Sequence, residues 1–256
     1  PYHDAQLSQQ YLETARAVYA YGQARPAAQA SNPEDFYTEE SWQDDMALAA
    51  AELFRATQEP AYLADAQNYL AEAGMGGGIY WGDLHALAAY ELARLDPASL
   101  PSALELLRAN LETSLEDFHK HPFGAALNEY YWGSNEGLAG TALIALWYED
   151  LGGEKTYHDL ATAQVDFILG NNPWGVSFVN GAGSLWPDHP HHQVADLSHI
   201  QLVGFWDEGA VPLAVFEEQE IGSMPDDPLA DFQTAEAVYH VWTPVYATNV
   251  PTISMN

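Results

Sequence analysis

The segment WPDHPHHQ, residues 186–193, places three histidines within four positions, around a proline. In an extended backbone, His189 and His191 would point to one side and His192 to the other, because successive side chains alternate. Two imidazoles could begin a zinc site, although no familiar zinc spacing such as HExxH accompanies them. They could instead donate hydrogen bonds to a polar ligand, or belong to a solvated loop. The pattern favours histidines that line a binding site for a polar ligand, and it leaves a zinc site and a solvated loop open as alternatives.

Aromatic residues offer such a ligand a second kind of contact. The segment YYWGSNEG carries Tyr130, Tyr131 and Trp132 directly before a predicted helix. The segment GGGIYWGDLHA places Tyr80 and Trp81 at a second junction between a loop and a helix. A single tryptophan is more often part of a core, but aromatic residues gathered at junctions are typical of ligand contacts. Because the flat C–H faces of a pyranose stack on such rings, the combination indicates carbohydrate.

Helices must position these residues, because helical periodicity dominates the chain and no region of similar length shows strand alternation. The sequence therefore predicts an all-α fold, with Gly170 at the C-terminal end of a helix. Four segments should each bury one face, made of these residues: Tyr11, Ala15, Val18 and Tyr19 in 11–22; Met46, Ala49, Ala50, Leu53 and Phe54 in 44–57; Leu104, Leu107, Leu111, Leu115 and Phe118 in 103–118; Ala161, Val165, Ile168 and Leu169 in 159–170.

A weak internal echo suggests how the helices are arranged. Residues 53–67 and 146–164 both show a helix end, a polar turn and then a tyrosine that opens the next helix. Repeated helical hairpins of this kind bury their faces only against neighbouring copies. The echo therefore predicts a solenoid or a closed ring of hairpins.

Charge and composition restrict the partners. The chain has 37 acidic and 7 basic residues, for a formal charge of −30, which disfavours nucleic acid and anionic membranes. The acidic composition could simply be that of an acidic secreted protein. The small number of lysines and arginines favours a second interpretation, adaptation to high salt. We expect an extracellular protein from a high-salt environment. The absence of cysteine excludes disulfides and thiolate metal sites. Because the sequence opens on Pro1, we also expect a processed or partial chain.

The segment DFILGNNPWGVSFVNGAGSLWPDHPHHQ, residues 166–193, resembles the histidine-loop signature of family 9 glycoside hydrolases, the inverting cellulases. YYWGSN, DFYTEESWQDDMALAAAELFRAT and YATNVPTISMN are similar to further segments of that family. The resemblance implies an (α/α)6 barrel of helical hairpins, with residues 1–256 forming a single, partial catalytic domain that acts on β-1,4-glucan. The WGSN form looks most like bacterial members that carry an immunoglobulin-like module upstream.

The resemblance also implies roles for particular residues. Trp81 and Trp132 would stack on sugar rings, and histidines of the loop would bond hydroxyl groups near the point of cleavage. The full set of expected substrate-binding residues is Tyr37, Trp81, Trp132, His189, His191 and Tyr246.

The catalytic residues are unknown at this level. The family's Asp pair lies in a DAGD-like string, which does not occur here. Its general acid is the Glu of Tyr-x-x-Asn-Glu; Tyr246 and Asn249 match, but Val250 occupies the acid position. Inversion needs a proton donor and a carboxylate that activates water, and valine can be neither. Losing one partner commonly costs roughly 10²- to 10⁴-fold in rate.

Two further departures concern the same region. Gln193 stands where the loop motif of the family carries arginine, which removes a fixed, bidentate donor. Val241 occupies the acidic position nine residues before Val250. Glu220 and Glu236 lie near this region, but neither has the matching spacing, so we expect no substitute acid from them.

Some family members bind calcium beside the cleft, and the strings ESWQDD and WGD fall at matching positions. Oxygen ligands of this kind suit calcium, although an acidic helix start would look similar. The expected calcium ligands are Glu40, Ser41, Asp44, Asp45 and Asp83. We expect no organic cofactor.

Three functions remain in competition with a β-1,4-glucan hydrolase. The first is a catalytically impaired, saccharide-binding relic of the same fold. The second is a hydrolase of glucosamine-containing oligosaccharides, whose cationic sugars would suit the acidic surface. The third is another α-ring enzyme, such as a polysaccharide lyase or an epimerase, which the scarcity of arginine disfavours.

Overall fold

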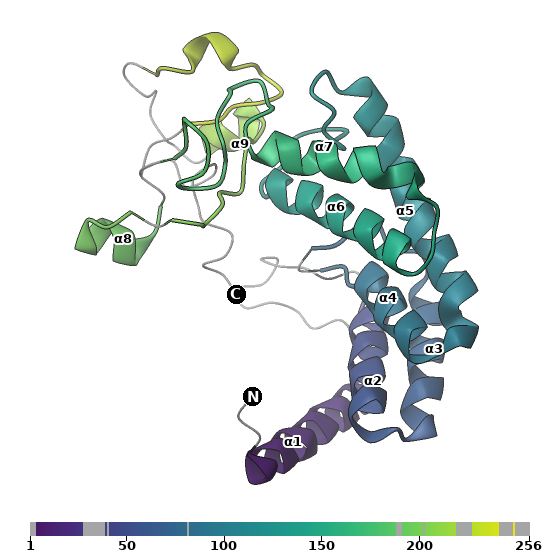
Figure 1. Cartoon of the computed structure of the whole chain (residues 1–256). Coiled ribbons are helices and arrows are strands. Elements are labelled where there is room, and N and C mark those ends of the chain that lie inside the picture. Colours follow the sequence, from purple (N-terminus) through teal and green to yellow (C-terminus); the bar gives the residue numbers. More distant parts are fainter. Residues whose placement is uncertain are drawn as a thin grey trace. The chain divides into compact units, whose positions relative to one another are not determined.

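The computed structural model describes residues 4–27, 39, 41–80, 82–187, 191–201, 203–218, 227–240 and 248. Within these ranges the chain is helical and holds no β-strand, only isolated β-bridges, which confirms the predicted all-α class. The α-helices are α1 Ala5–Gln23, α2 Gln43–Thr57, α3 Pro60–Ala73, α4 His85–Leu95, α5 Leu100–Lys120, α6 Ser134–Asp150, α7 His158–Ile168, α8 Gln193–Ser198 and α9 Leu213–Glu218 (Figure 1). Among the described helices, none is both long and apolar enough to cross a bilayer.

The chain divides into two compact units, which are described separately. The first unit comprises Pro1–Leu111 and Leu146–Lys155, and the second comprises Glu112–Ala145 and Thr156–Asn256. The single domain expected from the sequence stays a prediction.

Helices α2 and α3 form the hairpin at the centre of the first unit. Helix α2 ends at Thr57, the next residue Gln58 has a left-handed φ of 60°, and α3 begins at Pro60. Proline suits that position because the first N–H groups of a helix have no partner within it. The hairpin packs with Tyr19 of α1 and Leu92 of α4 around a common core, which includes Met46, Ala50, Ala51, Leu53 and Ala66.

The predicted buried face of α1 is wrong in part. Tyr19 is 5% exposed, but Tyr11 and Val18 are each 64% exposed. The Tyr19 hydroxyl donates to Asp65 at 2.9 Å, and its ring meets that of Tyr62 edge-on at 5.5 Å. These contacts with α3 turn the Tyr19 stripe inward, so the stripe that carries Tyr11 and Val18 faces outward.

The predicted face of α7 also needs correction. Val165 and Leu169 are 45% and 47% exposed, whereas the polar Gln164 is completely buried. Gln164 accepts from the Ala126 N–H at 2.7 Å and donates to the Gly124 carbonyl at 3.0 Å. Burial of Gln164 is favourable because it satisfies loop backbone groups that would otherwise lack partners. Leu160, Ala161, Phe167 and Ile168 complete the buried face.

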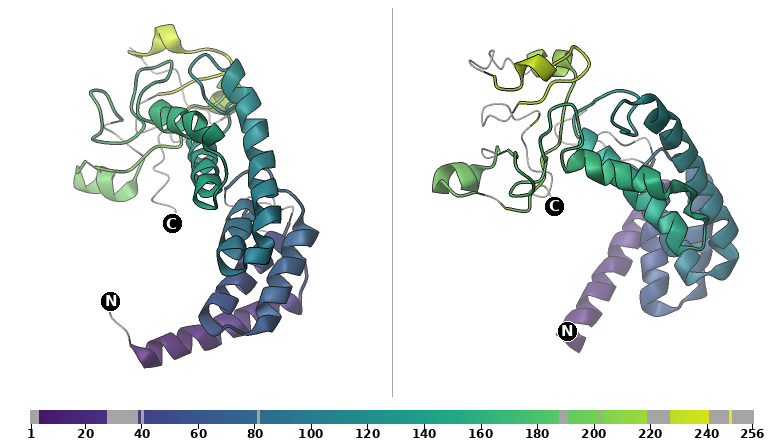
Figure 2. Two further views of the ribbon diagram at one scale, coloured as in Figure 1. Left: turned by 45° about the vertical axis from the view of Figure 1, so that its right-hand side comes forward. Right: turned by 45° about the horizontal axis from the view of Figure 1, so that its top comes forward.

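The second unit is built around α7 and an aromatic core. Phe178 lies edge-on to Tyr239 with ring centroids 4.7 Å apart, and Phe167 and Trp174 surround the same pair. Helices α6 and α7 run beside one another in both views of Figure 2. Like α2 and α3, they are joined by a short turn, which confirms that both echo segments are helical hairpins.

Candidate functional site

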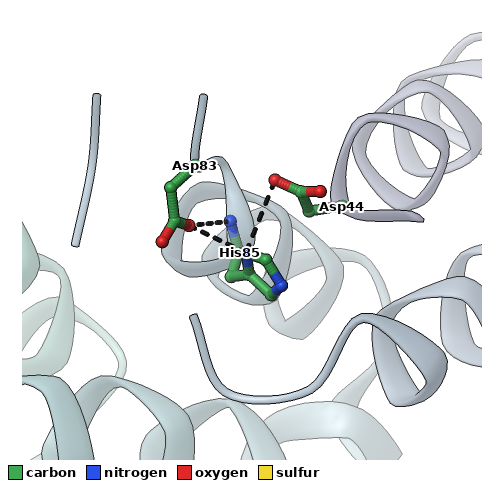
Figure 3. Close-up of side chains that lie close together, drawn as sticks. All are labelled: Asp44, Asp83 and His85. Carbon is green, nitrogen blue, oxygen red and sulfur yellow. Dashed lines mark hydrogen bonds and ion pairs between the residues drawn. The ribbon is translucent and has the colours of Figure 1, made fainter. Parts of the chain in front are cut away.

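Two carboxylates and one imidazole form a buried cluster in the first unit. Asp44 comes from the first turn of α2, Asp83 precedes α4 and His85 is its first residue, and they are 2%, 5% and 5% exposed. His85 Nδ1 lies 2.8 Å from Asp83 Oδ1 and 3.4 Å from Asp44 Oδ2. Figure 3 shows the imidazole between the two carboxylates.

The surroundings of His85 fix its charge. Its Nε2 lies 3.0 Å from the Ala73 carbonyl, and its Nδ1 faces the Asp83 carboxylate. Because both neighbours are acceptors, both ring nitrogens must carry protons, and the side chain is an imidazolium. The hydrogen bond to Asp83 accordingly raises the pKa of His85.

Backbone N–H groups complete the cluster. The Leu84 N–H donates to Asp44 at 2.8 Å, and the Gly77 N–H donates to Asp83 at 2.7 Å. Burial acts to raise the pKa of Asp83, but the hydrogen bonds from His85 and Gly77 outweigh it and lower the pKa overall. Asp83 is therefore held ionised despite its burial.

Of the five predicted calcium ligands, the structure brings Asp44 and Asp83 together. Asp44 Oδ1 has no hydrogen-bond partner, so the cluster leaves one oxygen available to a cation. The third group of the cluster is an imidazolium, which is not a hard oxygen ligand. Ser41 bonds Gln43, and Asp45 lines a cavity between α1 and α2. The residues fit calcium in part; Glu40 lies outside the described residues.

A second pair of buried carboxylates lies in the second unit. Asp207 and Glu208 are 0% and 3% exposed. Asp207 Oδ2 accepts from the Tyr239 hydroxyl at 3.2 Å, while its Oδ1 has no partner. Glu208 Oε2 is likewise buried without a hydrogen-bond partner.

The pKa values of both carboxyl groups are raised. Burial raises the pKa of Asp207 well above its usual range, and the neighbouring Glu208 adds to the effect. Burial and then the nearby Glu136 raise the pKa of Glu208 to about 8, against the opposing effect of the Trp132 hydrogen bond. Sequence reasoning missed this pair; the only signal is two adjacent acidic residues after the aromatic pair in GFWDEGA.

The WGSN segment holds the carboxylates in place. The Asn135 backbone N–H donates to the Glu208 carbonyl at 3.0 Å, and the Asn135 side chain donates to the Asp207 carbonyl at 2.8 Å. Ser134 donates to the Ala210 carbonyl at 3.0 Å. Gly209 has a φ of 94°, and a Cβ there would lie 2.7 Å from the Asn135 side chain. The start of α6 and residues 207–210 are thus locked together.

The expected sugar-binding residues are placed unevenly. Trp132 is 40% exposed, so its ring is open to a ligand, and His191 is exposed. His192 is occupied elsewhere, because its Nδ1 accepts from the Ala195 N–H at 3.3 Å and caps α8. Gln193 is the first residue of that helix. The remaining expected residues fall outside the described ones: Tyr37, Trp81, His189, Tyr246 and, at the general-acid position, Val250.

Trp174, which precedes the histidine loop, belongs to the core rather than to a ligand surface. It is 4% exposed, and its indole N–H donates to Gln233 at 3.0 Å. Its neighbour Tyr130 is within hydrogen-bond distance of His121, at 3.1 Å, beside a cavity of about 570 Å³. Among Tyr130, Tyr131 and Trp132, the residue that lies near a buried acid, Glu208, is therefore Trp132.

Comparison with known proteins identifies this helical-hairpin fold as that of the α/α-barrel glycoside hydrolases. The crystal structure of a metagenome-derived family 9 endoglucanase superposes with a TM-score of 0.78, covering 98% of this chain and 46% of that one at 23% identity. The family model for glycosyl hydrolase family 9 matches residues 2–241. The chain belongs to this family.

Two characterised relatives place the match within longer proteins. Endoglucanase C of Cellulomonas fimi is 28% identical over 209 residues, which cover 74% of this chain and 18% of that protein. Endoglucanase 14 of Arabidopsis thaliana is 26% identical over 228 residues, which cover 77% of this chain and 46% of that protein. The chain thus spans less than half the length of these relatives.

Proposed function

We propose that this protein is a glycoside hydrolase that cleaves β-1,4-glucan with inversion at the anomeric carbon. The observation that carries the proposal is the family 9 match over residues 2–241. The relatives named above are endoglucanases, and inversion is the mechanism of the family. In the second unit, the exposed ring of Trp132 supports a pyranose-stacking role.

The proposal also accounts for what the residues of this chain can contribute. Inverting hydrolysis requires an acid that protonates the leaving oxygen and a carboxylate that activates water. Val250 at the acid position supplies neither. The DAGD-like string that would supply the water-activating carboxylate does not occur either. Because losing one partner alone costs roughly 10²- to 10⁴-fold, we expect this chain alone to bind glucan and to turn it over more slowly still.

The test combines calorimetry with an assay of reducing sugar. Cellotetraose should bind the chain, and release of reducing ends from carboxymethyl cellulose should be slow. Replacing Val250 by Glu in the full-length gene product should raise the rate without tightening binding; an unchanged rate there would argue against acid catalysis at this position. If neither this chain nor the full-length gene product binds cellotetraose or releases reducing ends, the proposed glucanase activity is excluded.

A second candidate is the non-catalytic, saccharide-binding relic, which Val250 favours. It predicts cellotetraose binding without turnover in any form of the protein. A glucosamine oligomer in the same titration tests the amino-sugar alternative, which the net charge of −30 favours. Tighter binding of the glucosamine oligomer than of cellotetraose would select it.

We further propose calcium binding at the Asp44–Asp83 cluster. The unpartnered Asp44 Oδ1 supports it, and the imidazolium of His85 opposes it by its charge. A ligand at 100 times its dissociation constant stabilises a protein by about 2.7 kcal/mol. Calcium should therefore raise the melting temperature over an EDTA control, and Asp44→Asn should abolish the increase. An equal effect of magnesium, or none of calcium, would contradict the proposal.

Finally, we propose that the protein is secreted and works at high salt. A charge of −30 on 256 residues causes self-repulsion, which added salt screens. The melting temperature should rise between 0.1 M and 2 M KCl, whereas a salt-independent melting temperature would contradict the adaptation. The immunoglobulin-like module expected upstream stays a prediction.

A further inference from the structure

We infer that the outward face of α1 is an interaction surface, and that its partner is a helical segment of the remaining part of the family 9 domain, supplied by the full-length gene product. The inference rests on membership of the family and on the packing of the first unit. It does not depend on the activity proposed above, and it accounts for the exposure of Tyr11 and Val18, whose burial the sequence predicted.

The first step is the pattern of apolar side chains on α1. Four large ones are between 41% and 64% exposed: Leu7, Tyr11, Val18 and Tyr21. With Thr14 between them, their spacings alternate between four and three residues, so they form one stripe along the helix. This spacing is the one by which a helix packs lengthwise against another helix. Single exposed apolar residues are ordinary, but a continuous stripe indicates an interaction site.

The second step is the groove beside this stripe. A cavity of about 790 Å³ lies between α1 and α2, and Tyr11 and Val18 line it together with Met46 and Leu53 of α2. Met46 and Leu53 also belong to the core of the first unit. The groove therefore continues that core to the surface of the unit. An apolar side chain seated there would remove apolar area of both partners from water, which is the main favourable contribution to such packing.

The third step identifies the partner. Helical hairpins of a ring bury their faces only against neighbouring hairpins. Helix α1 meets the α2–α3 hairpin through the side that carries Tyr19, and the stripe lies on another side of the helix (Figure 1). The solved family 9 endoglucanase matches 98% of this chain with 46% of its own length, so more than half of that protein lies outside the match. Helices from that part of the domain, each with an apolar face, are the partner that suits the stripe.

A second copy of this chain suits the stripe less well. Each copy has a formal charge of −30, so association would bring strongly like-charged surfaces together. Acidic side chains line the groove itself, among them Glu39, Asp45 and Glu52. The chain has only 7 basic residues with which another copy could meet them.

The absence of cysteine allows a direct test by thiol labelling. Val18→Cys places a thiol in the stripe. Ala20→Cys is the matched control, because position 20 is exposed and lies about 200° further round the same helix. Each variant is made in this chain and in the full-length gene product and is labelled with iodoacetamide. Mass spectrometry of the peptide that contains position 18 or 20 gives the labelling rate.

In this chain, both thiols should react at rates within about 3-fold of one another, because both positions are exposed. In the full-length gene product, Val18→Cys should react at least about 10-fold more slowly than in this chain, because the partner helix must open before the label can enter. Ala20→Cys should change by less than about 2-fold between the two proteins.

Four results would overturn the inference. The first is an unchanged rate of Val18→Cys in the full-length gene product. The second is equal slowing of both thiols, which would mean that no particular face of α1 is covered. The third is protection of Val18→Cys in this chain alone that grows with its concentration and accompanies a dimer in analytical ultracentrifugation, which would assign the stripe to a second copy. The fourth is a gene that encodes no further part of the domain.

Discussion

The two units each bury a pair of carboxylates, and the pairs are treated in opposite ways. Asp44 and Asp83 enclose the imidazolium of His85 and accept backbone N–H groups, and the pKa of Asp83 is lowered. Asp207 and Glu208 have no cation beside them among the described residues, and both pKa values are raised. Burial is nearly equal in the two places. The two pairs differ in the number of hydrogen-bond donors and in the positive charge beside the carboxyl groups.

This difference determines whether the environment of each pair favours or disfavours ionised carboxyl groups. Burial alone disfavours an ionised carboxyl, and only hydrogen bonds or an opposite charge reverse that preference. In the first pair the pKa of Asp83 is lowered, which suits an ion cluster with His85. In the second pair burial raises the pKa of both Asp207 and Glu208, which disfavours their ionised form. The following changes test this contrast.

Replacing His85 should have the largest effect. His85→Ala leaves Asp44 and Asp83 buried without a counter-charge, and breaking one side of a buried ion pair costs about 3–5 kcal/mol. Denaturant unfolding at pH 6 measures the loss. The exposed His119→Ala serves as the matched control and should change stability by less than about 0.5 kcal/mol. A loss as small as that of the control would mean that the cluster is not an ion pair.

The pH dependence of stability should be next. The folded chain keeps the Glu208 proton up to about pH 8, whereas an ordinary Glu loses it near 4.5. Because the folded state binds more protons in this window, stability falls as pH rises through it, by up to about 1.4 kcal/mol per unit for this group.

The Glu208→Gln variant isolates that contribution. It should flatten the pH profile between about 4.5 and 8 and leave only the slope that the other shifted groups cause, Asp207 among them. Denaturant midpoints measured across this range provide the profile. A variant profile parallel to that of wild type would show that Glu208 ionises normally.

The smallest effect should come from Tyr239→Phe. The change removes the hydrogen bond to Asp207, at a cost of about 1–2 kcal/mol, because the acid then has one more unsatisfied oxygen. Thermal unfolding measures the loss, and Tyr11→Phe, on an exposed side chain, is the control. A larger loss than that of His85→Ala would reverse the contrast between the two pairs.

The sequence predicted part of this arrangement. The hairpins follow from helical periodicity and the internal repeat, and Trp132 from the aromatic residues that precede a predicted helix. Asp44 and Asp83 were indicated by the resemblance to family 9. Glu208 could not be found in this way, because its environment is created by Trp132 and Glu136, far away in the sequence. The burial of Gln164 was missed for a similar reason. Its partners are backbone groups of residues 124–126, and no pattern of side chains in the sequence predicts these contacts.

The tight approach of Gly209 to Asn135 has a consequence for engineering. Any side chain at position 209 must push against the amide that fastens α6 to the acidic segment, and its backbone angle is already one that favours glycine. A substitution there would disturb Asn135, whose side chain and backbone N–H bond the carbonyl groups of Asp207 and Glu208. The join between these two segments therefore depends on the absence of a side chain at position 209.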